Sequence, residues 1–501
     1  MYLLLRYGIL LSILFLGWNP GVAAGPLPLR LPTAPPPAPA PSGAVRDTVP
    51  ARYAGIDSVR VAEIVLLGHK RTRGSTILRE LPIKRGDRIA TQELETAIEL
   101  GYNNLMNTGL FARMEVRDSL VDRDAGEIWL ILDINETWYL YPVPVFELAD
   151  RNFNVWWNEQ NRDLDRINVG GKLTYYNFTG RRDRLKVGVQ TGYTQEYEAS
   201  YSLPYLNPAG SIGASVSYRF QRRREQNYAT RNNEQLFYQD RDAFVYRHST
   251  ADVSVNYRPG YYMNHSLSLG YRNTTIADTI ARVLNPEFFG GGRNAQQFLR
   301  ATYTFTNDRR DVRNYPWKGT YLQLQVEKDG LGIWNERSGM TLGATYRKFI
   351  PWGEKYSVNF GAAGKYSLIR SQQPFLENRA IGFGSNGVVG YQFYVVDGLD
   401  MVIWRAGIRR EFFDLDLDLG KWVFIDAFRY IPVRLLLAAQ FNQGFANSPF
   451  ADESNALNNN LLTGYSVGLD VVLFYDMVGS VQYNHNHLGE GGFFLALNLN
   501  F

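Results

Sequence analysis

The residues best suited to metal chemistry are two histidines near the C-terminus, His485 and His487. On an extended strand their spacing puts both side chains on one face, where they could share an ion. A metal site needs further ligands, and no cluster of carboxylates accompanies this pair. We therefore interpret the two histidines as part of a solvated loop, and the sequence predicts no metal site.

A second possible ion site is the run of alternating aspartates Asp414, Asp416 and Asp418, followed by Gly420. EF-hand calcium loops need glycine at the sixth position and glutamate at the twelfth. Here the glycine comes one position late and no glutamate closes the loop, which disfavours calcium. We expect segment 414–432 to be an extended hairpin or a short helix instead. Its aromatic residues, expected either at the inner leaflet of a membrane or against a partner, are Trp422, Phe424, Phe428 and Tyr430.

Motifs for catalysis are missing from the sequence. It has neither a nucleophile elbow nor a phosphate-binding loop. The absence of cysteine from 501 residues rules out disulfides, thiol catalysis and thiolate metal sites. A formal net charge of +4 gives no reason to expect a nucleic-acid partner. The sequence therefore predicts a protein that is not an enzyme and uses no cofactor.

The N-terminal segment is predicted to deliver and tether the rest of the chain. An apolar run over 7–18 follows Arg6 and precedes small residues at 22–24, so residues 1–24 are predicted to be an export signal peptide. Residues 25–57, dominated at first by proline and alanine, are expected to form an extended, disordered tether.

Residues 58–140 are predicted to form a small α+β domain, because apolar residues change there from helical to strand spacing and back. The expected elements are a strand at 59–67, a short helix capped by Ser75, a longer helix from Thr91, an exposed edge strand near 112–117 and a central strand at 128–132.

The end of the chain has strict alternation over 491–501. One side of this strand carries Phe493, Leu495, Leu497, Leu499 and Phe501. Alternation of apolar residues with Gln, Lys, Arg and Gly recurs back to about residue 145. This pattern is typical of a membrane barrel with a lipid-facing exterior and a polar lumen, rather than of a soluble sandwich.

Residues 141–501 are therefore predicted to form a transmembrane β-barrel of about 16 antiparallel strands. An even number of strands places both ends of the barrel on one side of the membrane. The strands are expected to begin near residues 146, 166, 183, 196, 210, 244, 262, 296, 319, 337, 355, 402, 431, 463, 478 and 492.

Three short motifs within 58–140 occur at characteristic spacings. They are Leu67-Gly68-His69-Lys70-Arg71-Thr72, Ile83-Lys84-Arg85-Gly86-Asp87 and Asn107-Thr108-Gly109-Leu110-Phe111. With these motifs the segment resembles the POTRA domain, and the available length holds one such domain. With its barrel ending in Phe501 and the strand end Tyr201-Ser202-Leu203-Pro204-Tyr205-Leu206-Asn207-Pro208, the chain resembles the BamA/TamA-like superfamily, or bacterial surface antigen family.

The resemblance implies an outer-membrane protein, with its POTRA domain in the periplasm, that inserts outer-membrane proteins or translocates a polypeptide. Implied partners are the outer-membrane bilayer, unfolded polypeptide clients and periplasmic accessory proteins. Clients are expected to add to the POTRA edge strand over 111–121, with Phe111, Met114 and Val116, and to a weakly sealed seam between the first and last barrel strands. The apolar side of the last strand matches the terminal signal that an assembly machine reads.

The resemblance also implies a loop folded into the lumen, with an Arg-Gly-aromatic tip whose arginine pairs with an aspartate on a nearby strand. The matching segments are Val388-Val389-Gly390-Tyr391 and Phe441-Asn442-Gln443-Gly444. Gly390, Tyr391 and Gly444 agree with the pattern, but Val389 replaces the arginine and Asn442 the aspartate. Joint loss leaves no uncompensated charge, which supports the alignment but puts latching by an ion pair in doubt. The alternative is a loop that merely resembles the motif.

Two other functions stay open. A passive pore or structural outer-membrane component is favoured by the missing Arg/Asp pair and opposed by the POTRA domain. A secretion pore dedicated to one client is the third possibility.

Overall fold

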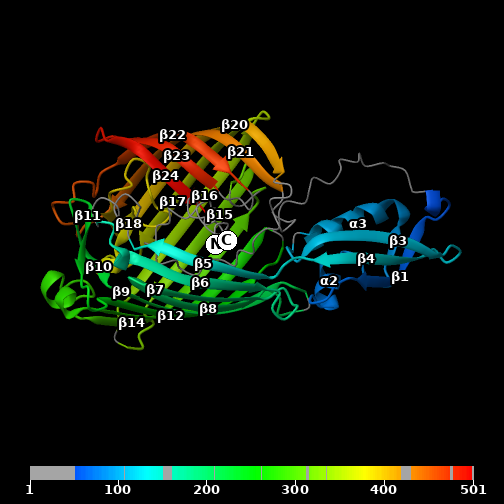
Figure 1. The fold of residues 1–501 in the computed structure, drawn as a ribbon, viewed down its shortest axis with the longest axis horizontal. Helices are drawn as coiled ribbons and strands as arrows, with labels where there is room; N and C mark the ends of the chain where they lie inside the picture. Colours follow the sequence, from blue (N-terminus) through cyan, green and yellow to red (C-terminus); the bar gives the residue numbers. More distant parts are fainter. Residues whose placement is uncertain are drawn as a thin grey trace, which may run out of the picture.

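A computed structural model describes residues 51–106, 108–149, 161–207, 209–260, 262–311, 315–334, 336–418, 430–473 and 478–498. They form a small α+β domain and a large curved sheet that lie end to end along the longest axis of the molecule (Figure 1). The predicted signal peptide and most of the predicted tether lie outside the described residues, as do Leu499 and Phe501.

The small domain packs two helices against a four-stranded sheet with strand order β2-β1-β4-β3. Its elements are η1 (Ala51–Tyr53), β1 (Ser58–Leu67), α2 (Gly74–Glu80), β2 (Arg88–Ala90), α3 (Thr91–Met106), β3 (Phe111–Asp122) and β4 (Glu127–Glu136). Ile128, Leu130 and Leu132 of β4 are fully buried in the core. As predicted, β4 lies inside the sheet and β3 at its edge.

Two details of this domain differ from the predictions. Ser75 does not cap α2, because the helix already begins at Gly74, with Arg73 at the N-cap position and no side-chain capping bond. The short strand β2 was not expected. It pairs with the start of β1, where Ser58 lies opposite Ala90, and so the chain enters α3 directly from a strand.

The large sheet has sixteen antiparallel strands, the number predicted. They are β5 (Leu140–Leu148), β6 (Ile167–Tyr176), β7 (Arg184–Gly192), β8 (Thr194–Leu203), β9 (Ile212–Arg223), β12 (Tyr246–Tyr257), β13 (Met263–Ile276), β14 (Ala295–Asp308), β15 (Gly319–Asp329), β16 (Gly339–Trp352), β17 (Tyr356–Ser367), β20 (Asp400–Asp418), β21 (Tyr430–Asn447), β22 (Leu462–Val472), β23 (Val478–Asn486) and β24 (Gly491–Asn498).

The first of these strands begins at Leu140, six residues before the predicted start near 146. Pro142 and Pro144 obscure it in the sequence, because proline lacks the N–H that an interior strand needs. Here β5 is the end strand of the sheet and, in the part of the chain that the structure describes, pairs with β6 alone, Pro142 lying opposite Leu173. Proline is tolerated in such an edge strand.

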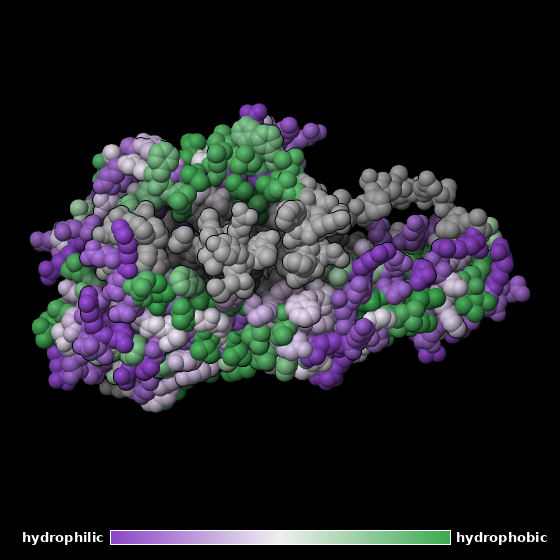
Figure 2. Space-filling model, viewed as in Figure 1, coloured by the Kyte–Doolittle hydropathy of each residue, from purple (hydrophilic) through white to green (hydrophobic). Residues whose placement is uncertain are grey.

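The two faces of the sheet differ as the alternation predicts. On β22, Tyr465, Val467 and Leu469 are about half exposed on the outside. Ser466 and Asp470 alternate with them and are buried on the inside. Apolar residues cover much of the outer surface of the sheet, while polar residues gather at the end farthest from the small domain (Figure 2). A polar interior and an apolar exterior are typical of a membrane barrel.

Several short elements join the strands at the end far from the small domain, called here the far end. They are β10 (Glu225–Arg231), β11 (Glu234–Gln239), η3 (Ile280–Leu284), η4 (Phe375–Glu377), β18 (Arg379–Ile381) and β19 (Val396–Asp397). The remaining short helix, η2 (Leu164–Arg166), precedes β6. None of the helices in the described ranges is long and apolar enough to cross a bilayer.

Candidate functional site

The two ends of the sixteen-stranded sheet, β5 and β24, face each other across a gap in Figure 1 and are not paired with each other within the described residues. Each has one hydrogen-bonded neighbour, β6 and β23 respectively. The sheet is therefore an open barrel. Both end strands present backbone N–H and C=O groups along one side, and such groups can pair with another extended chain.

The residues of the predicted terminal signal are partly described. Phe493 and Leu495 are 80% and 83% exposed on the outside of β24. Leu497 also lies in β24, while Leu499 and Phe501 lie beyond the described residues. Phe493 makes an edge-to-face contact with Tyr483 of β23, with ring centroids 5.2 Å apart. The apolar outer face of the closing strand is thus present.

The predicted POTRA edge residues turn inward. Phe111 and Met114 are buried, and Val116 packs against the same core. Their side chains are therefore unavailable to a client. What β3 offers is backbone, because within the described residues its one strand neighbour is β4.

The segment between β17 and β20 folds back into the lumen, as the resemblance implies. Val388 and Tyr391 are buried in a cluster with Ile403 of β20 and Leu462 of β22. A side chain at Gly444 would collide with Val388, because its Cβ would lie 2.7 Å from Cγ2. We call residues 379–397 the lumen loop. It packs against the inner face of the last strands.

Glycines let the tip of the lumen loop approach the wall closely. A Cβ on Gly464 would overlap the carbonyl oxygen of Val389. Gly390 has φ +83°, which favours glycine, and its carbonyl accepts a 2.9 Å hydrogen bond from Asn486 Nδ2. Tyr391 is bonded through its hydroxyl to His487. The three tip residues named from the sequence thus contact β22, β23 and the turn after β23.

Val389 and Asn442 line one cavity of about 430 Å³ beneath the lumen loop. A direct bond between them is not among the described contacts. Asn442 lies opposite Arg405 in the register of β20 and β21. Arg405 Nη2 donates to the carbonyls of Ser385 (2.8 Å) and Gly387 (2.9 Å) in the lumen loop. The positively charged side chain of Arg405 therefore holds the lumen loop here, and it belongs to strand β20 of the barrel wall and not to the loop tip.

Sequence reasoning missed Arg405 because the family pattern directs attention to the loop tip. Two signals could have found it. It is a charged residue on the inward side of a predicted strand, and it is the cross-strand neighbour of the position where the family carries aspartate. The buried Oδ1 of Asn442 accepts no hydrogen bond within the described part of the chain.

At the far end, the β10–β11 hairpin crosses the lumen to meet two other segments. Asn233, at its tip, is 1% exposed and donates from Nδ2 to Val395 O (3.2 Å) and Asn458 Oδ1 (2.8 Å). Its own Oδ1 accepts from Leu457 N at 2.8 Å. Asn232 and Asn233 have φ of 52° and 59°, typical of a type I′ turn. The hairpin, the lumen loop and segment 448–461 are joined by buried asparagines.

At the opposite mouth, the turn between β14 and β15 enters the lumen. Tyr315 is buried and donates to Asp470 Oδ2 on β22 at 2.7 Å. Trp317 packs against the same cluster, and its carbonyl accepts from Ser357 Oγ. Side chains thus occupy part of the lumen at both mouths.

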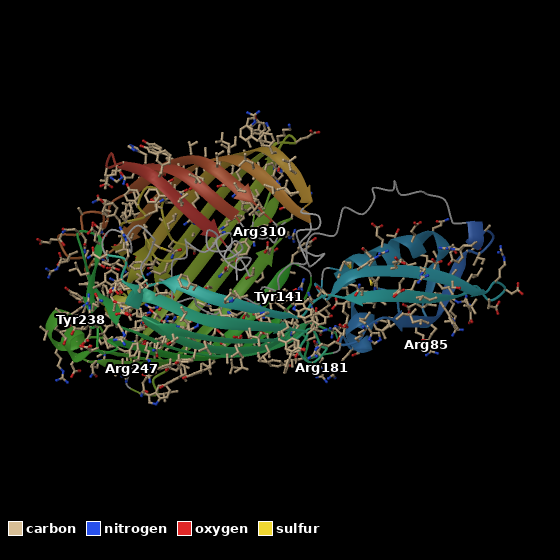
Figure 3. The ribbon with its side chains drawn as sticks, viewed as in Figure 1. Arg85, Tyr141, Arg181, Tyr238, Arg247 and Arg310 are labelled. Carbon is tan, nitrogen blue, oxygen red and sulfur yellow. The ribbon has the colours of Figure 1, made fainter. Side chains whose placement is uncertain are left out.

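The small domain is docked to the turn between β6 and β7, where Figure 3 labels Arg181. Arg73 N donates to Gly180 O at 3.0 Å, and Arg71 Nε donates to Asn177 O at 3.0 Å. Asn177 Nδ2 donates to Thr72 Oγ1, which is also bonded to the Tyr139 hydroxyl. The motif that resembles POTRA at 67–72 therefore forms the joint to the barrel.

The pKa values of two groups at this joint, Tyr139 and Glu136, differ from their ordinary values. Burial raises the pKa of Tyr139 to about 12, so the phenol stays protonated. Burial also opposes ionisation of Glu136, but hydrogen bonds from Thr72 and from the backbone of residues 70–72 outweigh it and hold its pKa below the usual value. Glu136 accepts from Thr72 N at 2.6 Å and from Arg71 N at 3.0 Å.

The two histidines considered for metal binding, His485 and His487, contact different residues. His487 is bonded to Tyr391, whereas the ring of His485 packs against Tyr465. Across the described ranges, no group of three or more His, Cys, Asp or Glu is arranged to hold a metal ion. The aspartate segment forms an extended hairpin as far as it is described, with Asp418 opposite Tyr430. Trp422, Phe424 and Phe428 lie outside the described residues.

Comparisons with known proteins agree with this architecture. The model of the Omp85 superfamily domain matches residues 177–397, and that of POTRA, the surface antigen variable number repeat, matches residues 59–137. No curated protein sequence matches the chain.

Three solved structures share the fold. BamA from Haemophilus ducreyi lacking POTRA domains 1–3 is 14% identical, with TM-score 0.52 over 87% of this chain and 85% of the other. CdiB from Escherichia coli is 13% identical, with TM-score 0.53 over 88% and 74%. CdiB from Acinetobacter baumannii is 13% identical, with TM-score 0.50 over 88% and 74%.

The fold is therefore that of a sixteen-strand β-barrel protein preceded by one POTRA domain. Its barrel carries an Omp85 superfamily domain over residues 177–397. This confirms the predicted BamA/TamA-like architecture with a single POTRA domain.

Proposed function

We propose that this protein resides in the bacterial outer membrane, with its POTRA domain in the periplasm, and assists the insertion of outer-membrane proteins or the translocation of a polypeptide. It acts without catalysis or cofactor. Its partners are the lipid bilayer, unfolded polypeptide clients and periplasmic accessory proteins, and they do not include nucleic acid.

The observation that carries the proposal is the pair of end strands, β5 and β24, which do not pair with each other within the described residues. An edge strand binds an extended chain through backbone hydrogen bonds largely regardless of its side chains. Clients of varied sequence can therefore add to the same edge. The free side of β3 offers a second edge within the POTRA domain.

A passive pore agrees less well with the lumen. Asn233 joins three segments at the far mouth, and Tyr315 reaches across the near mouth to Asp470. These contacts place side chains in part of the lumen at both mouths. A secretion pore dedicated to one client would use the same edges and differs in its clients.

Depletion of the protein followed by proteomics of the outer membrane and the medium tests the proposal. Coordinated loss of several barrel proteins from the membrane supports assembly. Loss of one secreted protein supports dedicated secretion. If protein content is unchanged while uptake of small solutes falls, the proposal is wrong and the protein is a pore. Resupplying the wild-type chain controls for indirect effects.

A further inference from the structure

The hairpin of β20 and β21 extends past its neighbours at the POTRA side of the barrel. The two strands pair with each other as far as Asp418 opposite Tyr430. Pairing of β17 with β20 stops at Tyr356 opposite Arg410, and pairing of β22 with β21 stops at Val472 opposite Arg434. We call residues 411–418 and 430–433 the free ribbon. Past the Glu411 N to Lys355 O bond, the outer edge of β20 has no strand neighbour within the described residues.

The free ribbon is long enough to extend beyond the headgroup region of a bilayer. At ~3.3 Å per residue and a tilt of ~40°, residues 411–418 rise roughly 20 Å past the neighbouring strands. The headgroup region adds about 5–8 Å beyond the hydrocarbon core on each side. The rim below the ribbon carries Trp352, which is 66% exposed, and Tyr356, with Arg410 over its ring at 5.5 Å. Aromatic and basic residues of this kind mark a membrane interface.

The free ribbon nevertheless has an apolar outer face. Phe413, Leu415 and Leu417 are 57%, 54% and 47% exposed. In the register of the hairpin they lie opposite Leu435, Val433 and Ile431. This face continues the outer surface of the sheet, where Figure 2 shows apolar residues over β20 and β21. Apolar side chains exposed to water beyond the membrane indicate an interaction site.

The charge of the free ribbon indicates which segment would fit it. Aspartate occupies positions 414, 416 and 418, between the apolar residues. Glu411 is already paired with Arg434, whose Nε lies 2.7 Å from Oε2. The ribbon is thus acidic, and a strand beside it gains from basic residues placed between apolar ones. Apolar residues at every second position are also the pattern of outer-membrane strands before they fold.

We propose that the free ribbon docks an extended, amphipathic segment of a client polypeptide. The segment adds as a strand along the outer edge of β20, with its apolar side chains beside Phe413, Leu415 and Leu417 and basic side chains between them. The inference rests on the proposed function for its orientation toward the periplasm and for its clients. It places a client-binding edge at the POTRA-side rim, separate from β5 and β24 (Figure 1).

Site-specific photo-crosslinking of the full chain in liposomes tests this proposal. A photoreactive amino acid is placed at Leu415 or Leu417, with Trp404 as the matched control, since it is 49% exposed on the same face of β20 within the paired region. The probe is a urea-unfolded outer-membrane β-barrel polypeptide. We expect at least five-fold more polypeptide adduct from 415 and 417 than from 404. Adducts with lipid alone, or equal yields at all three positions, would overturn the proposal.

Competition identifies the chemistry of the segment. A peptide that alternates leucine with lysine should suppress the adduct at 415, whereas one that alternates leucine with glutamate should not. Equal competition by the two peptides contradicts the predicted charge preference.

A double variant, L415K with L417K, provides a second measurement. It should lower adduct formation from a probe at Phe413 at least five-fold while the unheated barrel keeps its gel mobility. The control pair L331K with I333K changes two exposed residues of a far-end loop and should leave the adduct unchanged. If the wild type accelerates client insertion but the chain with the photoreactive amino acid at 415 forms no client adduct, this inference fails and the proposed function stands. If the wild type accelerates neither insertion into liposomes nor translocation of a polypeptide across their membrane, the proposed function fails, and the peptides still test docking.

Discussion

Arg405 and Asn442 lie opposite each other on β20 and β21, and the guanidinium of Arg405 reaches from there to the carbonyls of Ser385 and Gly387. The lumen loop is therefore held by a cation on the barrel wall. Hydrogen bonds from a charged donor contribute about 1.5–3 kcal/mol each. Arg405 thus supplies a charged donor to the loop, although Val389 stands where the resemblance implies an arginine.

Replacing Arg405 by methionine should loosen the lumen loop, because the two carbonyls lose their charged donor. We expect the unheated barrel to lose its compact gel mobility at a temperature at least 5 °C lower than the wild type. Lysine at 405 should restore part of the difference, since one ammonium keeps the charge but lacks the planar fork of donors. R282M is the control, because Arg282 is an exposed far-end residue. Equal thermal shifts for R405M and R282M would contradict this role.

The charges of the family motif can be restored one at a time. V389R places a second cation in the cavity that Arg405 and Asn442 line and should destabilise the loop. N442D alone should be nearly neutral, because Arg405 is its cross-strand neighbour. The double variant should regain much of the loss, since the new carboxylate can pair with the new guanidinium. Strictly additive shifts in gel mobility would show that residues 389 and 442 do not meet.

The joint between the POTRA domain and the barrel should weaken in acid. The folded pKa of Glu136 lies below the ordinary value of 4.5. Its carboxylate therefore stabilises the joint above pH 4.5, and this contribution is lost as the pH falls through the folded pKa. The chain has no cysteine, so spin labels at R85C and R181C report the distance across the joint.

We expect the distance distribution of the wild type to be narrow at pH 7 and to broaden below pH 4.5. The distance distribution of E136Q should be broad at both pH values, because an amide accepts hydrogen bonds through its oxygen but not through its nitrogen. Widths that change with pH to the same extent in E136Q and the wild type would refute this assignment.

The asparagine contacts of the far end should keep the mouth at that end closed. N233A removes three side-chain hydrogen bonds and places alanine at φ 59°, which strains the turn. We expect higher conductance in planar bilayers and faster surface proteolysis near residue 233. N233G removes the strain but does not restore the lost hydrogen bonds, so its conductance should be nearly as high as that of N233A. Wild-type conductance in both variants would show that the mouth is sealed by other contacts.

The fold could be predicted closely because a membrane strand is specified locally. Alternation along β22 or β24 identifies each strand without knowledge of its neighbours. The start of β5 could not be read in this way, since Pro142 and Pro144 are tolerated only because β5 lies at an end of the sheet. The tip of the β10–β11 hairpin could not be placed in this way either, because Asn233 is held by contacts with segments more than 150 residues away.

The residues at the tip of the lumen loop could be predicted from the sequence, but Arg405, which holds the loop, could not. Gly390, Tyr391 and Gly444 follow a sequence pattern, and close packing explains each glycine. Arg405 depends on register across strands and on the path of a long loop, and single-sequence patterns contain neither. The unpaired ends of the sheet are likewise a property of the whole barrel.

The most direct test of the proposed function is the rate at which an unfolded outer-membrane β-barrel polypeptide inserts into liposomes that contain the purified full-length protein. Folded client is followed by its gel mobility and its resistance to external protease. We predict insertion at least ten-fold faster than in empty liposomes, and inhibition by a peptide that matches the client's last strand. Insertion no faster than in empty liposomes, together with free passage of small solutes, would contradict the account and identify the protein as a passive pore.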